Sequence, residues 1–133
     1  SFHDQKIAQL NSELSTQKVI QKHCDSYRLC RKVIEDCKSE KNPKAYRTKH
    51  QAEYLLHDSL KKELQNLGVT KIPSSDKIKK RIENLESEQT ASVREKQGLQ
   101  EKQKLLNTIQ QNFNVLLDAP EMQPPLSEKE NTL

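Results

Sequence analysis

Helix-breaking residues are few in this chain, and their positions limit what it can fold into. Pro43, Gly68 and Pro73 are the only strong breakers before residue 119, because proline lacks a backbone donor and glycine readily ends a helix. Between them, apolar residues recur at steps of three and four, the period of one helix face. We therefore predict helices near residues 4–41, 44–67 and 75–118, with no β-sheet.

Each predicted helix carries its own apolar stripe. The first stripe comprises Ile7, Leu10, Leu14, Ile20, Cys24, Tyr27, Cys30, Ile34 and Cys37. The second comprises Ala45, Ala52, Leu56, Leu60, Leu64 and Leu67. The third comprises Ile78, Ile82, Leu85, Leu99, Leu106, Ile109, Phe113 and Leu117, with polar residues at several intervening core positions. The third stripe has the spacing of a weak coiled-coil seam.

Composition narrows the fold class further. Only 32% of the 133 residues are hydrophobic, against roughly 45–50% apolar usage in ordinary domains, so a large single core is excluded. Two glycines and no tryptophan disfavour turn-rich β folds. The sequence predicts an all-α module over residues 1–118. Residues 119–133 are expected to form a disordered, proline-rich acidic tail.

The short turns between the predicted helices suggest their arrangement. One reversal at Pro43 and another at residues 68–75 would give an up-down-up, long-helix three-helix bundle or coiled coil. Helices one and three would then run parallel. Matching helix lengths predicts a shared body of residues 17–41, 44–67 and 75–99, with both ends of the chain overhanging.

The overhanging end of the third helix is strongly apolar. An exposed patch of this kind usually marks a contact surface. We expect it to be covered by another chain, most simply a second copy, so that the protein is a homo-oligomer such as a dimer. A fold-back at Gly98 is the internal alternative. The expected self-association residues are Leu106, Ile109, Phe113, Leu116 and Leu117.

Catalytic and metal-binding patterns are not found in the sequence. The spacing of Cys24, Cys30 and Cys37 matches no zinc motif, and their stripe predicts packing. Histidines at positions 50 and 57 are two turns apart and are expected at the helix surface or edge. No nucleophile motif or phosphate loop occurs, and the tyrosines are expected to pack. We predict a non-enzyme without cofactor, metal or small-molecule substrate.

Segments that the sequence lacks indicate a cellular compartment. No membrane-spanning stretch or signal peptide is recognisable, and an odd number of cysteines argues against a disulfide framework. We expect a cytoplasmic protein with no membrane partner. The chain opens at Ser1 without a methionine, which suggests a larger parent protein upstream.

A local basic cluster offers a second kind of function. Residues 44–72 carry six Lys and Arg against three Asp and Glu, and further cations crowd the start of the third helix. Weak, sequence-independent binding to DNA phosphates is one interpretation, and a solvated helix face is the other. No continuous basic stripe with interleaved aromatic residues supports a strong site. The candidate phosphate contacts are Lys71, Lys77, Lys79, Lys80 and Arg81.

Three segments together resemble a known family. They are the run KAYRTKHQAEYLLHDSL at residues 44–60, the turn KIPSS at 71–75 followed by Ile78, and NVLLDA at 114–119 after a long charged helix. In this order, over roughly residues 24–120, they look like the C-terminal region of relaxases. These proteins are the mobilisation nucleases of Gram-positive conjugative and mobilisable elements.

The resemblance implies a bacterial accessory module rather than a nuclease. Relaxases of this kind resemble other HUH nucleases, whose histidine cluster and catalytic tyrosine lie in an upstream domain, so no catalytic residue is carried over. The implied roles are self-association or contacts with relaxosome and transfer proteins in conjugative DNA mobilisation. An auxiliary DNA-binding domain and a structural coiled coil of an unrelated scaffold protein stay open as alternatives.

Overall fold

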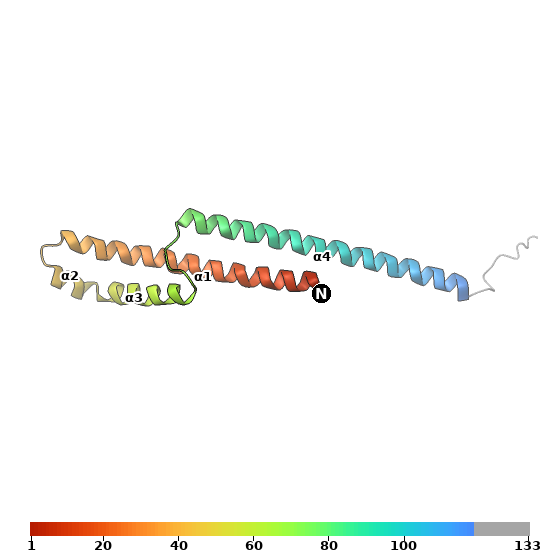
Figure 1. Ribbon diagram of the computed structural model, residues 1–133, viewed down its shortest axis with the longest axis horizontal. Coiled ribbons are helices and arrows are strands. Elements are labelled where there is room, and N and C mark those ends of the chain that lie inside the picture. The colour runs from red at the N-terminus through yellow and green to blue at the C-terminus, as the bar shows by residue number, and fades with distance from the viewer. Residues whose placement is uncertain (119–133) are drawn as a thin grey trace, which may run out of the picture. The chain divides into compact units, whose positions relative to one another are not determined.

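The computed structural model describes residues 1–118, and this part of the chain is helical without any strand (Figure 1). The elements are α1 (Phe2–Asp36), a 3-10 turn η1 (Cys37–Ser39), α2 (Pro43–Lys49), α3 (Gln51–Asn66) and α4 (Ser75–Asp118). The predicted all-α class is confirmed for these residues. The expected tail at 119–133 lies outside the described residues.

Side-chain caps explain where three of the helices begin. The Ser1 hydroxyl accepts a hydrogen bond from the Asp4 backbone N–H at the start of α1. The side chain of Asn42 accepts from the N–H of Ala45 at 3.1 Å, one residue before the proline that opens α2. The Ser74 hydroxyl accepts from the N–H of Lys77 at 3.2 Å. Each cap satisfies a donor that the first turn of a helix leaves without a partner.

Two predicted helix boundaries were wrong. The first helix ends at Asp36 rather than at residue 41, because the chain tightens into η1 before Pro43. The predicted second helix is divided at His50, whose ψ of 24° leaves the helical range. Tyr46, in α2, donates its hydroxyl to the Val33 carbonyl at 2.7 Å and so ties α2 to α1. After this break, α3 packs against α1 as a separate helix.

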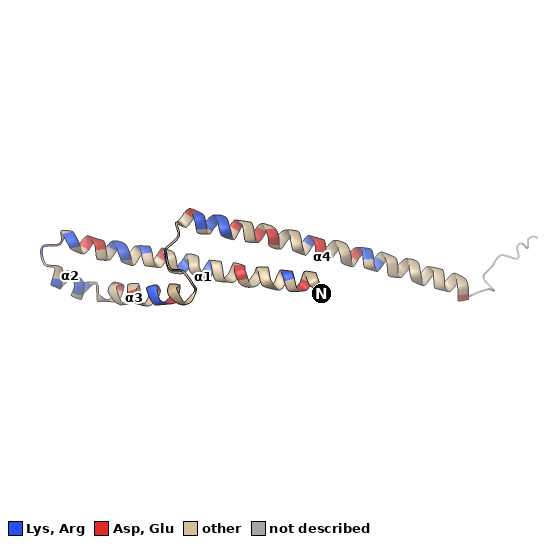
Figure 2. Cartoon of the chain, in the orientation of Figure 1, with Lys and Arg blue, Asp and Glu red and all other residues tan. Residues whose placement is uncertain are grey.

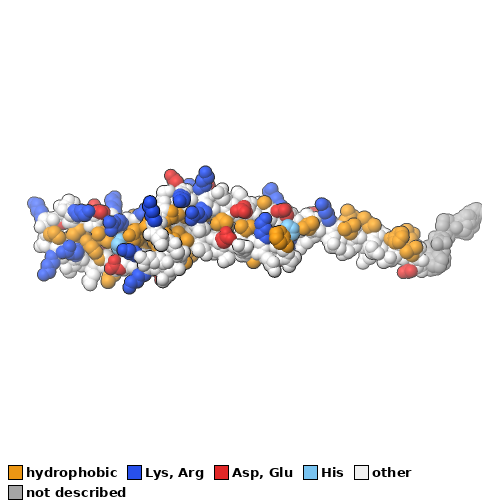
Figure 3. Space-filling view, viewed as in Figure 1, with side chains coloured by type: hydrophobic (Ala, Val, Ile, Leu, Met, Phe, Trp, Pro, Cys, Tyr) orange, Lys and Arg blue, Asp and Glu red, His pale blue; other side chains and the backbone are white. Residues whose placement is uncertain are grey.

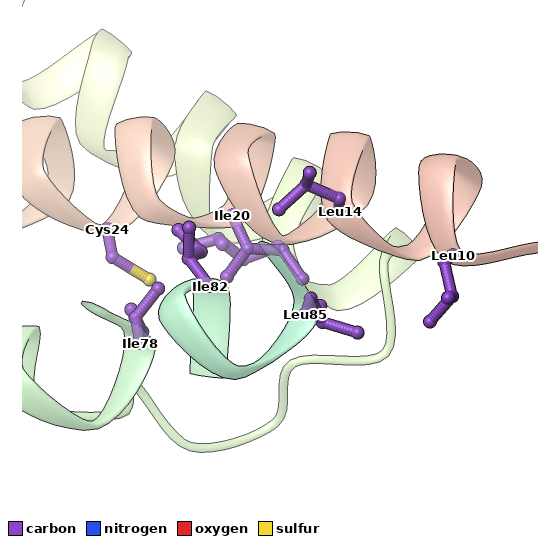
Figure 4. Packing of buried hydrophobic residues seen from close by; sticks show 8 residues of the cluster. Leu10, Leu14, Ile20, Cys24, Ile78, Ile82 and Leu85 are labelled. Carbon is purple, nitrogen blue, oxygen red and sulfur yellow. The ribbon is translucent and has the colours of Figure 1, made fainter. Parts of the chain in front are cut away.

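The described chain divides into two units, Ser1–Ser92 and a second that begins at Val93, and α4 contributes to both. In the first unit, α1 is the central helix. Its C-terminal half packs against α3, where the rings of Tyr27 and His57 stack with centroids 4.6 Å apart. The stretch of α1 from Leu10 to Cys24 packs against the first part of α4, and Figure 4 shows Cys24 facing Ile78.

The first part of α4 runs antiparallel to α1, so the predicted up-down-up order is wrong. Arg28 donates to the carbonyl of Pro73, Lys18 pairs with Glu86 at 3.8 Å, and Asn11 accepts from Gln89. Residue numbers in α4 thus rise as those in α1 fall.

The connector at residues 67–74 explains this direction. The chain turns at Gly68, whose φ of 84° ends α3, and it bends again at Thr70 and Lys71 before Ser74 opens α4. Between them Val69 and Ile72 pack against the core. The chain therefore crosses over α1 and continues in the direction of α3 (Figure 1). The single reversal that the sequence predicted does not occur.

The core of this unit is small and joins three helices. It extends to the N-terminal part of α1, which the sequence assigned to an overhang, because α4 covers that part instead of α3. Its buried residues are Leu10, Leu14, Ile20, Cys24, Leu64, Ile78, Ile82 and Leu85 (Figure 4). A polar residue, Ser92, is also almost fully buried on α4.

Candidate functional site

An exposed apolar surface on the C-terminal part of α4 is the strongest candidate site. Every residue from 101 to 118 is exposed. The predicted self-association residues lie here, with exposed fractions between 54% for Ile109 and 67% for Leu116. Figure 3 shows orange side chains gathered on this part of the helix. We define the apolar surface of α4 as Leu99, Leu105, Leu106, Ile109, Phe113, Leu116 and Leu117.

These residues share one side of the helix. At about 100° per residue they fall within an arc of about 120°. Val115 is also exposed but projects from another side. No charged residue occurs between Leu105 and Leu117, and the polar residues among them are asparagine, glutamine and threonine. From Leu105 to Leu117 the arrangement is a continuous apolar stripe with an uncharged border, whereas Lys102 lies on the same side of the helix between Leu99 and Leu106.

The predicted phosphate contacts lie together in sequence around the start of α4. Lys71, Lys77, Lys79, Lys80 and Arg81 are all exposed, and Figure 2 shows blue residues crowded at the first turns of α4. None of the five forms an ion pair with a residue in the described part of the chain. Their charges are therefore available to an anion.

Acidic residues interrupt this cluster. Arg81 lines a shallow cleft together with Glu13 and Gln17 of α1. Asp76 lies in the first turn of α4, and Glu83 follows closely along the helix. The cluster is thus a local concentration of cations rather than a long basic groove.

The tyrosines are held in packing and hydrogen-bonding roles. Burial raises the pKa of Tyr46, whose hydroxyl bonds to α1. A hydrogen bond with Cys37, together with burial, raises the pKa of Tyr54. A phenol with a raised pKa stays protonated at neutral pH and is a poor nucleophile. Tyr27 stacks on His57. This arrangement matches the packing role that the sequence predicted.

The cysteines are buried and unpaired, as their stripe predicted. Burial raises the pKa of the Cys24 and Cys30 thiols, which lowers their fraction of reactive thiolate. Within residues 1–118, no group of three His, Cys, Asp or Glu side chains could hold a metal ion.

One histidine lies where the sequence did not place it. His57 is only 9% exposed, because it packs against Tyr27 of α1 rather than lying at the surface or edge. Its Nδ1 lies 3.4 Å from the Asp58 carboxylate, and its Nε2 is buried with no hydrogen-bond partner. His50 is half-buried, with Nδ1 3.5 Å from Glu53. The sequence did contain a signal for this burial, because His57 lies three and seven residues before Leu60 and Leu64 and so shares their face of the helix.

Comparisons with known proteins add no relative. This chain matches no protein-family model, no curated protein and no solved structure. Among the helices of residues 1–118, none contains an apolar stretch long enough to cross a membrane.

Proposed function

We propose that this chain is a non-catalytic helical accessory module that self-associates through the apolar surface of α4. The exposure of that surface is the observation that carries the proposal. Large exposed apolar patches on proteins in water commonly mark contact surfaces. From Leu105 to Leu117 the polar residues that border this surface are uncharged, so they can form hydrogen bonds with a partner and do not repel one by charge.

Burial of the five self-association residues of α4 in a dimer would supply the free energy of association. Burying one Leu, Ile or Phe side chain contributes roughly 1.5–3 kcal/mol, so burying all five contributes on the order of 10 kcal/mol per chain. Lost translational and rotational freedom opposes association by several kcal/mol. The free energy gained by burying these side chains is large enough to offset the lost freedom of motion. In a homodimer, both copies contribute it.

The biological setting of the proposal comes from the resemblance to relaxases. In that setting the module is part of a bacterial DNA-mobilisation protein and joins copies of it, or joins it to relaxosome or transfer proteins, in the cytoplasm. A catalytic domain would precede it in the parent chain. An unrelated structural coiled coil would use the same surface in the same way, and the upstream coding sequence distinguishes the two.

Sedimentation equilibrium of the whole chain tests the proposal. We expect a molar mass that rises with concentration and reaches twice the 15.4 kDa of one chain. A monomer at all concentrations up to the millimolar range would contradict self-association, because the exposed surface would then not bind a second copy of the chain.

A second candidate function is weak binding to DNA phosphates, favoured by the five exposed cations near the start of α4, which form no ion pair with another residue of 1–118. We expect sequence-independent binding at low salt that weakens steeply as salt rises, because bound cations release counterions from DNA. Replacing Lys77, Lys79, Lys80 and Arg81 together by alanine should remove most of this affinity. Fluorescence anisotropy with a labelled duplex at several salt concentrations measures it.

A matched control separates this cluster from net charge. Alanine at Lys32, Lys41, Lys44 and Lys49, which are also exposed, removes the same four charges elsewhere. If both quadruple variants lose affinity equally, binding follows total charge and the cluster is a solvated face.

A further inference from the structure

We propose that the occupant of the apolar surface of α4 is a second copy in the antiparallel orientation, paired as a two-stranded coiled coil over residues 99–116. This inference rests on the proposed self-association and specifies its geometry. It places Leu99 opposite Leu116 of the second copy, Lys102 opposite Phe113, and Leu106 opposite Ile109.

The seam of this pairing follows a heptad spacing. Leu99, Leu106 and Phe113 are seven residues apart, as are Lys102, Ile109 and Leu116. The two sets occupy the a and d positions of three heptads, the positions that interlock between paired helices. All six side chains lie on described, exposed turns of α4. Five of the six are apolar, and Lys102 is the exception.

The residues beside the seam favour an identical partner. In coiled coils, charges at the flanking e and g positions usually select the partner. Here these positions hold Gln103, Gln110, Asn112, Leu105 and Leu117, with no charge. Amide side chains both donate and accept hydrogen bonds. A second copy of the same surface can therefore satisfy them, and no like charges meet across these flanks.

The position of the charges selects the orientation. In a parallel pair, Lys102 would lie against Lys102 of the second copy within the seam, and like charges opposed there are destabilising. Residues 94–104 carry four cations against the two acids Glu95 and Glu101, so the net positive ends of both copies would also gather, with Asp118 of both at the other end. An antiparallel pair separates these groups and brings the cationic end of each helix toward the acidic end of the other.

The antiparallel register also accommodates Lys102. Opposite Phe113 of the second copy, its ammonium group can lie over an aromatic ring, a contact that is favourable because the face of the ring carries partial negative charge. Its methylene groups cover apolar surface while the charge stays in water. Within residues 99–116, the other two pairings, Leu99 with Leu116 and Leu106 with Ile109, are apolar on both sides.

Distances between spin labels on two copies test the orientation. The labels are attached to Gln97→Cys in one variant and to Gln111→Cys in another. Both positions are exposed and lie two heptads apart on the outward side of the seam. The native thiols are buried, so labelling without denaturant favours the introduced cysteine. Wild-type chain treated identically is the labelling control.

The proposed register predicts different results for the two variants. Labels at Gln97 should be offset along the helix axis by roughly 32 Å, since residue 97 aligns with residue 118 of the second copy at 1.5 Å per residue. Labels at Gln111 should be offset by only about 10 Å. Pulsed electron-spin resonance measures both separations.

The possible outcomes are distinct. Two short and equal separations would show a parallel pair, which overturns this inference and leaves self-association standing. Long separations with a different offset would show another antiparallel register and overturn the Lys102–Phe113 pairing. Absence of any intermolecular distance from a monomeric chain would overturn the proposed function together with this inference.

Discussion

Replacing Leu64 with alanine is expected to lower the free energy of unfolding by about 2–5 kcal/mol, the range for removing a buried leucine and leaving a cavity. Leu64 is 1% exposed and belongs to the core that joins α1, α3 and α4. Its loss therefore weakens contacts to two neighbouring helices at once. Urea denaturation followed by circular dichroism, at one protein concentration throughout, measures the change.

Leu55 provides a matched control on the same helix. It is 62% exposed, so Leu55→Ala deletes the same atoms without opening a cavity. Because alanine and leucine are both good helix formers, we expect a change within about 0.5 kcal/mol. Equal losses for the two variants would mean that α3 does not present Leu64 to the core.

The double variant Ile109→Asp and Phe113→Asp should raise the dissociation constant of the dimer at least a hundredfold, or about 2.8 kcal/mol. Each substitution removes an apolar contact and would bury a charge beside the second copy, which is costly. In a two-fold dimer each change occurs twice. Sedimentation equilibrium over a range of concentrations compares the variant with the wild type.

The control for this variant keeps the added charge and moves it off the seam. Thr108→Asp and Asn114→Asp introduce two carboxylates into the same turns of α4, at positions outside the apolar surface. We expect the control to associate nearly as the wild type does. If it dissociates to the same extent, negative charge alone breaks the oligomer and the apolar surface is not the contact.

Local signals in the sequence were sufficient for the all-helical class and for several helix ends, and they were insufficient for the break at His50 and for the directions of the helices. Helix caps and stops depend on neighbouring residues only. In the structure, Asn42 and Ser74 cap helix starts and Gly68 ends α3. The break at His50 has no such marker, since neither proline nor glycine occurs near it, and the contact that Tyr46 makes with α1 just before it is between residues far apart in the sequence. The direction of α4 depends on how two turns combine over a crossing of α1, which no local pattern encodes.

The candidate surface was predicted correctly as exposed, but partly for the wrong reason. From the sequence, we expected the end of the third helix to be uncovered because the second helix is too short to reach it. In the structure, the packing partner of the first part of α4 is α1. Leu106 and Phe113 are exposed in the single chain, and their burial by a second copy stays a prediction. The buried position of His57 was missed because the spacing of His50 and His57 was judged only for metal binding, and the contact with Tyr27 joins two different helices.

The exposure of every residue from 101 to 118 has a consequence for the secondary structure of α4 itself. Short helices without tertiary support are marginal in water, because the entropy of ordering the backbone nearly cancels the hydrogen bonds gained. The first turns of α4 gain that support from the core, whereas the last turns gain it by dimerisation under this proposal. Folding of the last turns is then a bimolecular reaction, and mass action sets the helix content of each chain.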